Sequence, residues 1–272
     1  MNKVFTLVKA PRLKLNAAVA MVLLFSALGS KVLGYPTRYG PFPAGQAPTS
    51  LTLNKCDLVH VDKSKTGDTD GEVRQYRIHA TESGQKQITL ALRESTNGWA
   101  IDLRDAQGKS LMLASFTNGM TSSQMEVFSC DLNGDGQPDF IVNIWSGGTG
   151  IAMDSSEVTF LLSSKNGYQA TSFFMYSFGK EDLIRFKPNG PVYFISNDLI
   201  SSDDETIHDG RLHNFWVYEL KRIDGTHFIP ADADRPGFPK WVWFTDKENH
   251  GETTQLSEEQ KTRLLIKRNA TN

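Results

Sequence analysis

The chain has 272 residues, with 29 Lys and Arg against 31 Asp and Glu, and hydrophobic residues make up 39% of it. This length and composition allow one domain with a hydrophobic core of its own. The slightly acidic balance, without a basic patch, argues against nucleic acid and anionic membrane surfaces as partners.

Residues 1–34 have the features of a secretory signal peptide. A basic leader without acidic residues precedes an apolar run over residues 17–28, and small residues follow it at Gly29 and Ser30. The apolar run is shorter than the roughly 20 residues that a membrane-spanning helix needs. We therefore predict an exported protein, periplasmic or secreted, that is cut near Gly29 or Gly34 and keeps no membrane span. An uncleaved N-terminal anchor is the alternative.

Cleavage after Gly34 would leave 238 residues (272 − 34) and remove five of the 29 basic residues, so the mature chain would carry 24 − 31 = −7 charges. Residues 35–50 are rich in Pro and Gly and have no apolar periodicity, which is typical of a linker.

Residues 51–272 are predicted to form a single β-rich domain. Polar and apolar residues alternate with period two in several segments, among them residues 51–61 and 87–94. Asn-Gly or Asp-Gly pairs at 166–167, 189–190 and 224–225 predict tight turns. Ser257 and Gln260 form a capping-box pattern at the start of a C-terminal helix. We expect an all-β fold, either propeller-like or a sandwich of antiparallel hairpins, with a short C-terminal helix.

The two cysteines of the chain, Cys56 and Cys130, both follow the predicted leader. In an exported protein an even pair of cysteines predicts a disulfide. Two buried free thiols are the alternative.

The segment SCDLNGDGQPDFIV, residues 129–142, has oxygen-bearing side chains at alternate positions. Counted from Asp131, the positions one, three, five, six and nine are Asp131, Asn133, Asp135, Gly136 and Asp139. A tight loop with this pattern can surround a hard cation such as Ca²⁺, which takes six to eight oxygen ligands. The Gln137 carbonyl would complete the set. Position twelve is Val142 instead of the Glu of an EF-hand, and both flanks are strand-like. A polar turn without metal is the alternative.

This loop resembles the calcium loops of FG-GAP repeats, found in integrin α-subunit propellers and in many bacterial secreted proteins. The resemblance covers about residues 126–162. It implies Ca²⁺ as the cofactor and a loop that joins two strands of one blade. It implies metal ligation by Asp131, Asn133, Asp135, Asp139 and the Gln137 backbone.

Two other groups of residues could carry chemistry. Acidic residues around 203–209 could serve a secreted hydrolase acting on glycans, although their spacing also suits a polar loop. Trp241 and Trp243 would share one strand face and could stack on a sugar, although such pairs more often lie in a core. We favour a non-enzymatic module, an exported calcium-binding β-domain that binds an extracellular protein or carbohydrate.

Overall fold

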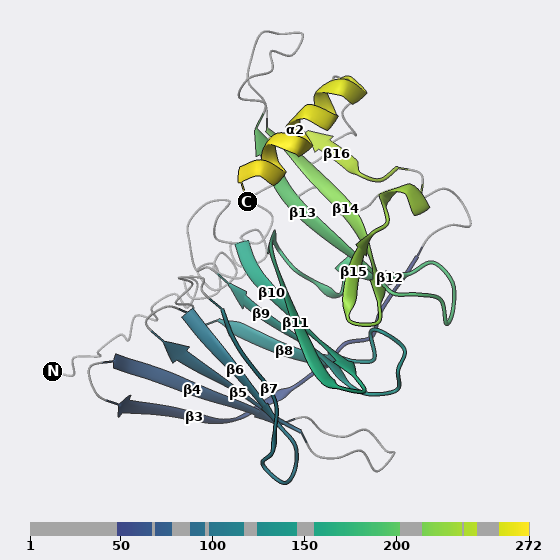
Figure 1. Ribbon diagram of the computed structural model, residues 1–272. Coiled ribbons are helices and arrows are strands. Elements are labelled where there is room, and N and C mark those ends of the chain that lie inside the picture. Colours follow the sequence, from purple (N-terminus) through teal and green to yellow (C-terminus); the bar gives the residue numbers. More distant parts are fainter. Residues whose placement is uncertain are drawn as a thin grey trace, which may run out of the picture.

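The computed structural model describes residues 48–66, 69–77, 88–95, 98–116, 124–145, 155–201, 214–235, 237–243 and 256–271. The predicted signal peptide, most of the predicted linker and the acidic segment 203–209 lie outside these ranges. The described chain forms three antiparallel sheets and one α-helix (Figure 1). The prediction of an all-β fold with a short C-terminal helix is confirmed. Within the described ranges, no helix has the length and apolar character needed to cross a membrane.

Each sheet is assembled mainly from hairpins of consecutive strands. Sheet C has the order β3-β4-β5-β6-β7, with β3 at Asp57–Thr66, β4 at Thr69–Arg77, β5 at Thr89–Ser95, β6 at Gly98–Arg104 and β7 at Ser110–Phe116. Sheet B has the order β11-β10-β9-β8-β2, with β2 at Asn54–Lys55, β8 at Met125–Cys130, β9 at Asp139–Trp145, β10 at Ser155–Ser164 and β11 at Gly167–Tyr176.

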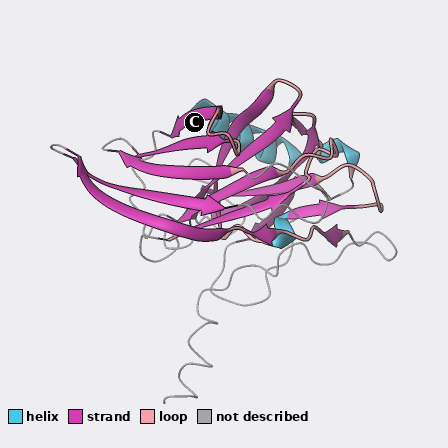
Figure 2. Cartoon of the chain, turned by 90° about the horizontal axis from the view of Figure 1, so that it is seen from below, coloured by secondary structure: helices cyan, strands magenta, loops and turns pink. Residues whose placement is uncertain are grey.

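Sheet A carries the C-terminal helix. Its order is β1-β12-β13-β14-β15, and β16 also pairs with β14. The bounds are β1 Thr49–Ser50, β12 Leu183–Arg185, β13 Tyr193–Ser201, β14 Asn214–Asp224, β15 His227–Pro230 and β16 Lys240–Trp243. Two short 3-10 helices, η2 at Lys180–Asp182 and η3 at Asp232–Asp234, lie in its connections, and α2 spans Glu258–Thr271. Figure 2 shows that strands make up most of the molecule and helices little of it.

The first described segment ties the three sheets together. In chain order it supplies β1 at the edge of sheet A, β2 at the edge of sheet B and β3 at the edge of sheet C. Because these three edge strands follow one another within 18 residues, from Thr49 to Thr66, the position of each sheet edge is coupled to the next.

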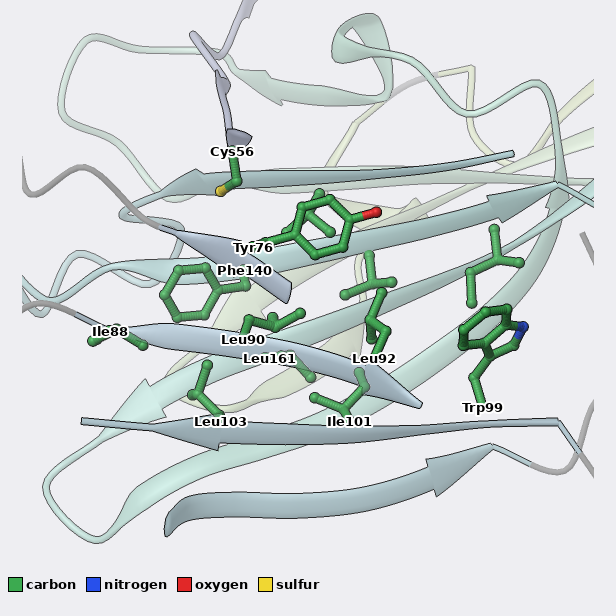
Figure 3. Close-up of a cluster of buried hydrophobic side chains, with 13 residues drawn as sticks. Cys56, Tyr76, Ile88, Leu90, Leu92, Trp99, Ile101, Leu103, Phe140 and Leu161 are labelled. Carbon is green, nitrogen blue, oxygen red and sulfur yellow. The ribbon is translucent and has the colours of Figure 1, made fainter. Parts of the chain in front are cut away.

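Sheet B is the middle layer, and its two faces belong to different cores. Alternate residues of a strand point to opposite faces. In β9, Phe140, Val142 and Ile144 pack with residues of sheet C, among them Leu90 and Ile101 (Figure 3). The neighbouring Ile141 packs with residues of sheet A in the second core. This face-to-face stack of antiparallel sheets is compatible with both predicted arrangements, a sandwich and propeller-like blades.

The predicted turns and helix start are found within one residue of the predicted places. Ser164 pairs with Gly167 and Asp224 with His227, so the two-residue loops are 165–166 and 225–226. Gly167, the first residue of β11, has φ +114°, Gly225 has φ +58° and Asn189 has φ +58°. At the start of α2, the Ser257 N–H donates to Gln260 Oε1 (2.8 Å) and the Gln260 N–H donates to Ser257 Oγ (3.2 Å). This reciprocal pair is the expected capping box.

Candidate metal-binding loop

The Asp-rich segment connects β8 to β9 at one end of sheet B. The last residue pair of these two strands is Cys130 with Asp139, so residues 131–138 form the connection. Gly134 and Gly136 have φ of +80° and +79°, in the left-handed region where glycine has no steric penalty. The two glycines therefore allow the chain to curl within eight residues.

The alternate polar side chains fold back onto the backbone of the loop. Asp131 accepts from the Gly134 N–H through Oδ1 (2.7 Å) and from the Gly136 N–H through Oδ2 (3.1 Å). Asn133 Oδ1 accepts from the Asp135 N–H (3.1 Å), and Asp135 Oδ1 accepts from the Gln137 N–H (2.8 Å). These side chains thus cap backbone N–H groups of the loop, and Asp131 and Asp135 are solvent-exposed.

Asp139 differs from the other predicted ligands because its side chain is completely buried. Its Oδ2 accepts from the backbone N–H groups of Leu132 (2.7 Å) and Asn133 (3.2 Å). Its Oδ1 accepts from the N–H and the hydroxyl of Ser163, each at 2.6 Å. Burial raises the pKa of Asp139 to about 6, although these four hydrogen bonds favour the charged carboxylate.

The hairpin β10–β11 holds the loop from the side. The Ser163 hydroxyl lies 3.0 Å from both carboxylate oxygens of Asp135, and Asn133 Nδ2 donates to the Ser163 carbonyl (2.8 Å). The Tyr168 hydroxyl donates to the Pro138 carbonyl (3.0 Å). Burial raises the pKa of Tyr168, and the negative charges of Asp139 and Asp135 raise it further. Two elements distant in sequence therefore share one polar network.

The loop brings together some of the predicted ligands and not others. Among the described residues, no three His, Cys, Asp or Glu side chains are grouped so that they could hold a metal ion. Asp135 and Asp139 meet at the Ser163 hydroxyl, whereas Asp131 is turned to its two backbone donors. The carboxylate, amide and carbonyl oxygens on the exposed side of the loop are hard donors, the chemistry that Ca²⁺ prefers. The donor set of Asp131, Asn133, Asp135 and the Gln137 carbonyl therefore fits Ca²⁺ in type.

The predicted Cys56–Cys130 disulfide does not form, since both cysteines are free. Cys56 follows β2, belongs to the core between sheets B and C and donates its N–H to the Val127 carbonyl (2.8 Å). Cys130 ends β8 and packs against the core on the other face of sheet B. A disulfide needs Cα atoms within about 7 Å and side chains that point toward each other. Opposite faces of one sheet cannot meet this condition, so the structure contradicts the bridge.

The predicted tryptophan platform is not available at Trp241, which is 1% exposed and packs against Phe215, with ring centroids 6.0 Å apart. It therefore belongs to the core. The side chain of Trp243 lies outside the described part of the structure, as do the acidic residues around 203–209.

Two open cavities are lined by successive stretches of the segment that joins the sheets, residues 50–53 and 55–58. One, of about 500 Å³, is lined by residues that include Arg74, Tyr76 and Trp145. The other, of about 650 Å³, is lined by residues that include Phe128, Phe178 and Lys180. Glu126 lines both cavities and forms an ion pair with Lys55. Both linings therefore combine aromatic rings with charged side chains.

Sequence reasoning missed Ser163 and Tyr168. Both lie in β10 or β11 next to the Asn166-Gly167 turn, and neither has a local pattern that links it to the loop. Their position follows from the pairing of β9 with β10, whose last pair is Leu161 with Phe140. Comparison with protein families, characterised proteins and solved structures gives no match to this chain.

Proposed function

We propose that this chain is an exported calcium-binding β-domain, periplasmic or secreted, in which the loop between β8 and β9 binds one Ca²⁺ with a structural role. The observation that carries the proposal is the loop itself. Three side chains with hard oxygen atoms, Asp131, Asn133 and Asp135, lie at alternate positions of one turn that two left-handed glycines allow. A turn alone does not require two exposed carboxylates so close in sequence.

The ion would be held by Asp131, Asn133, Asp135 and the Gln137 carbonyl, the hard oxygen donors on the exposed side of the loop. When bound, Ca²⁺ supplies positive charge that offsets the repulsion between these carboxylates. The loop connects two strands of the middle sheet and contacts the hairpin β10–β11. A cation there would therefore stabilise the junction of four strands of sheet B, β8 to β11.

The binding partner would be an extracellular protein or a carbohydrate. The two cavities beside Glu126 support a binding role, because their volumes and mixed lining suit a small polar ligand or a side chain of a partner. A glycan-acting hydrolase is not proposed, since its acidic residues lie outside the described part of the chain.

The calcium proposal is tested by thermal unfolding in saturating Ca²⁺ and in chelator. Because the ion binds the folded state and hardly the unfolded one, a hundredfold excess over the dissociation constant should add about 2.7 kcal/mol to the free energy of unfolding. Asp135→Ala removes a central ligand and should abolish this calcium-dependent increase. Identical wild-type melts in both buffers, together with no calcium by elemental analysis, would leave the loop as a plain turn.

A further inference from the structure

Asp139 has no carboxylate lone pair left for a metal ion in this structure. A carboxylate has two oxygens and about four acceptor positions. The four donors are the N–H groups of Leu132, Asn133 and Ser163 and the hydroxyl of Ser163. Each oxygen of Asp139 accepts two of these bonds, so its hydrogen-bonding capacity is filled by the protein alone.

The position of Asp139 in the sheet explains why these donors meet there. The residue pairs of β9 and β10 run from Trp145 with Ser156 to Phe140 with Leu161 and stop at that point. One step beyond the last pair, the Asp139 side chain accepts the Ser163 N–H at 2.6 Å. The Asp139 carboxylate thus accepts a backbone hydrogen bond from β10 at the point where the backbone pairing of β9 with β10 ends and the loop adjoins β9. Asp139 is 0% exposed and Ser163 is 1% exposed, so water cannot replace these bonds.

Asp135 is in a different situation. The Ser163 hydroxyl has one hydrogen, and its nearest acceptor is Asp139 Oδ1 at 2.6 Å, compared with 3.0 Å for each oxygen of Asp135. If the hydrogen lies on the line to Asp139, the Asp135 oxygens face a hydroxyl lone pair. Asp135 is exposed and its Oδ2 has no other partner among the described residues. A cation bound to Asp135 would offset the repulsion between its oxygens and the hydroxyl lone pair of Ser163. To bind Asp139, a cation would have to displace the hydrogen bonds that the protein already makes to its carboxylate.

We propose that Asp139 and Ser163 form a cation-independent latch that closes the loop on β10, and that the ion is held by Asp131, Asn133, Asp135 and the Gln137 carbonyl without Asp139. The second half of this statement rests on the proposed calcium site, and the first half does not. Asp139 and Ser163 are positioning residues in this arrangement. They keep the loop closed before the ion arrives, so the ligands need little rearrangement on binding.

The test compares Asp139→Asn with Asp135→Asn, which removes the same single charge from the same loop. Melting temperatures are measured for both variants and wild type in chelator and in saturating Ca²⁺. Asp139→Asn should lower the melting temperature by about 5 °C or more in both buffers, because its amide group faces N–H donors, and should keep the calcium-induced rise. Asp135→Asn should hardly change the melting temperature in chelator and should lose the calcium-induced rise.

The opposite pattern would overturn the latch. If Asp139→Asn melts like wild type in chelator and loses only the calcium-induced rise, Asp139 is a metal ligand.

Should Asp139→Asn fail to fold, Ser163→Ala removes one hydroxyl and keeps the backbone bonds. It should lower the melting temperature by about 2 °C equally in both buffers, while Ser164→Ala, at the neighbouring turn, is its control. An unchanged Ser163→Ala melt in chelator would contradict the latch. If Ca²⁺ does not change the melting temperature of the wild type, the calcium site is contradicted. The melting temperatures of the variants in chelator then decide on the latch alone.

Discussion

The two cysteines are separated by the thickness of sheet B, and their surroundings keep both thiols protonated. Burial raises the pKa of Cys56 to about 11, although its hydrogen bond with Ser129 opposes the shift. Burial also raises the pKa of Cys130 to about 12, and the nearby carboxylates of Asp139 and Asp131 contribute. The thiolate is the reactive form of cysteine, so neither side chain is chemically activated.

We therefore expect both thiols to be unreactive in the native protein. At pH 8, a thiol reagent such as Ellman's reagent should modify fewer than one cysteine per folded chain and two after unfolding in guanidinium. Reductant should leave the melting temperature unchanged. If mass spectrometry gave a native mass two hydrogens below that of the reduced chain, with no reactive thiol after unfolding, the Cys56–Cys130 bridge would be restored.

At the scale of single residues, the sequence predicts what depends on neighbours in the chain. The left-handed glycines at 136 and 167 and the capping pair Ser257 and Gln260 are local features, and each is found as expected. The disulfide was a non-local prediction made from a count of cysteines, and it is wrong because strand alternation places the two side chains on opposite faces. Ser163 could not be predicted, because its contact with Asp139 spans 24 residues and depends on strand register.

The C-terminal helix packs on sheet A through both apolar and charged contacts. Leu264, together with Leu256 just before the helix, packs in the same core as Phe215, Val217 and Trp241. Near the end of the helix, Arg268 Nη2 donates to Glu219 Oε1 on β14 (2.7 Å), and its Nε lies 3.9 Å from Asp198 Oδ2 on β13. The Arg268 and Glu219 side chains are 15% and 19% exposed, so solvent screens this pair only partly.

Burial tends to raise the pKa of Glu219, but Arg268 and Lys221 outweigh this effect and hold the pKa below its ordinary value of 4.5. A carboxylate whose pKa is lowered by folding contributes stability above its unfolded pKa, and the contribution is lost as the pH falls through the folded pKa. The contribution of the Arg268–Glu219 pair is thus complete at pH 7 and decreases as the pH falls from about 4.5 through the lower folded pKa.

We expect Arg268→Met to lower the free energy of unfolding by about 1–3 kcal/mol at pH 7, because it removes the guanidinium from two partly buried carboxylates, Asp198 and Glu219, of which Glu219 keeps Lys221 as a partner. The difference from wild type should shrink as the pH falls below 4.5. Guanidinium unfolding curves at pH 7 and pH 3 measure both values. Lys261→Met is the control, since among the described residues Lys261 forms its ion pair with the exposed Glu258 one turn away, and such pairs contribute about 0.2–0.5 kcal/mol. A difference that stays constant with pH would show that Arg268 acts by packing alone.

For the whole molecule, period-two alternation was sufficient to predict strands, hairpins and the all-β class. It could not predict how the hairpins stack, because a strand such as β10 is buried on both faces and its residues are almost all inaccessible. The role of residues 49–66 as edge strands of three successive sheets was equally hidden. The segments involved are two residues long in β1 and β2, too short to give a periodic signal.

The shared middle sheet predicts that the two cores unfold together. Phe160 and Leu161 are neighbours in β10, yet Phe160 lies in the core with sheet A, 4.9 Å from the ring centroids of both Phe194 and Phe228. Leu161 lies in the core with sheet C, in the same cluster as Leu90 and Leu103. Phe160→Ala should lower the free energy of unfolding by about 3–5 kcal/mol and Leu161→Ala by about 2–5 kcal/mol.

Because both side chains extend from the same strand, neither sheet A nor sheet C can lose its core without exposing one face of sheet B. Calorimetry should therefore show a single unfolding transition for wild type and for both variants, moved to lower temperature in each variant. Two transitions, of which Phe160→Ala moves only one and Leu161→Ala only the other, would mean that the outer sheets are independent units. In that case the residues 49–66 that join the three sheet edges would be a flexible connection, and the middle sheet would not transmit stability between them.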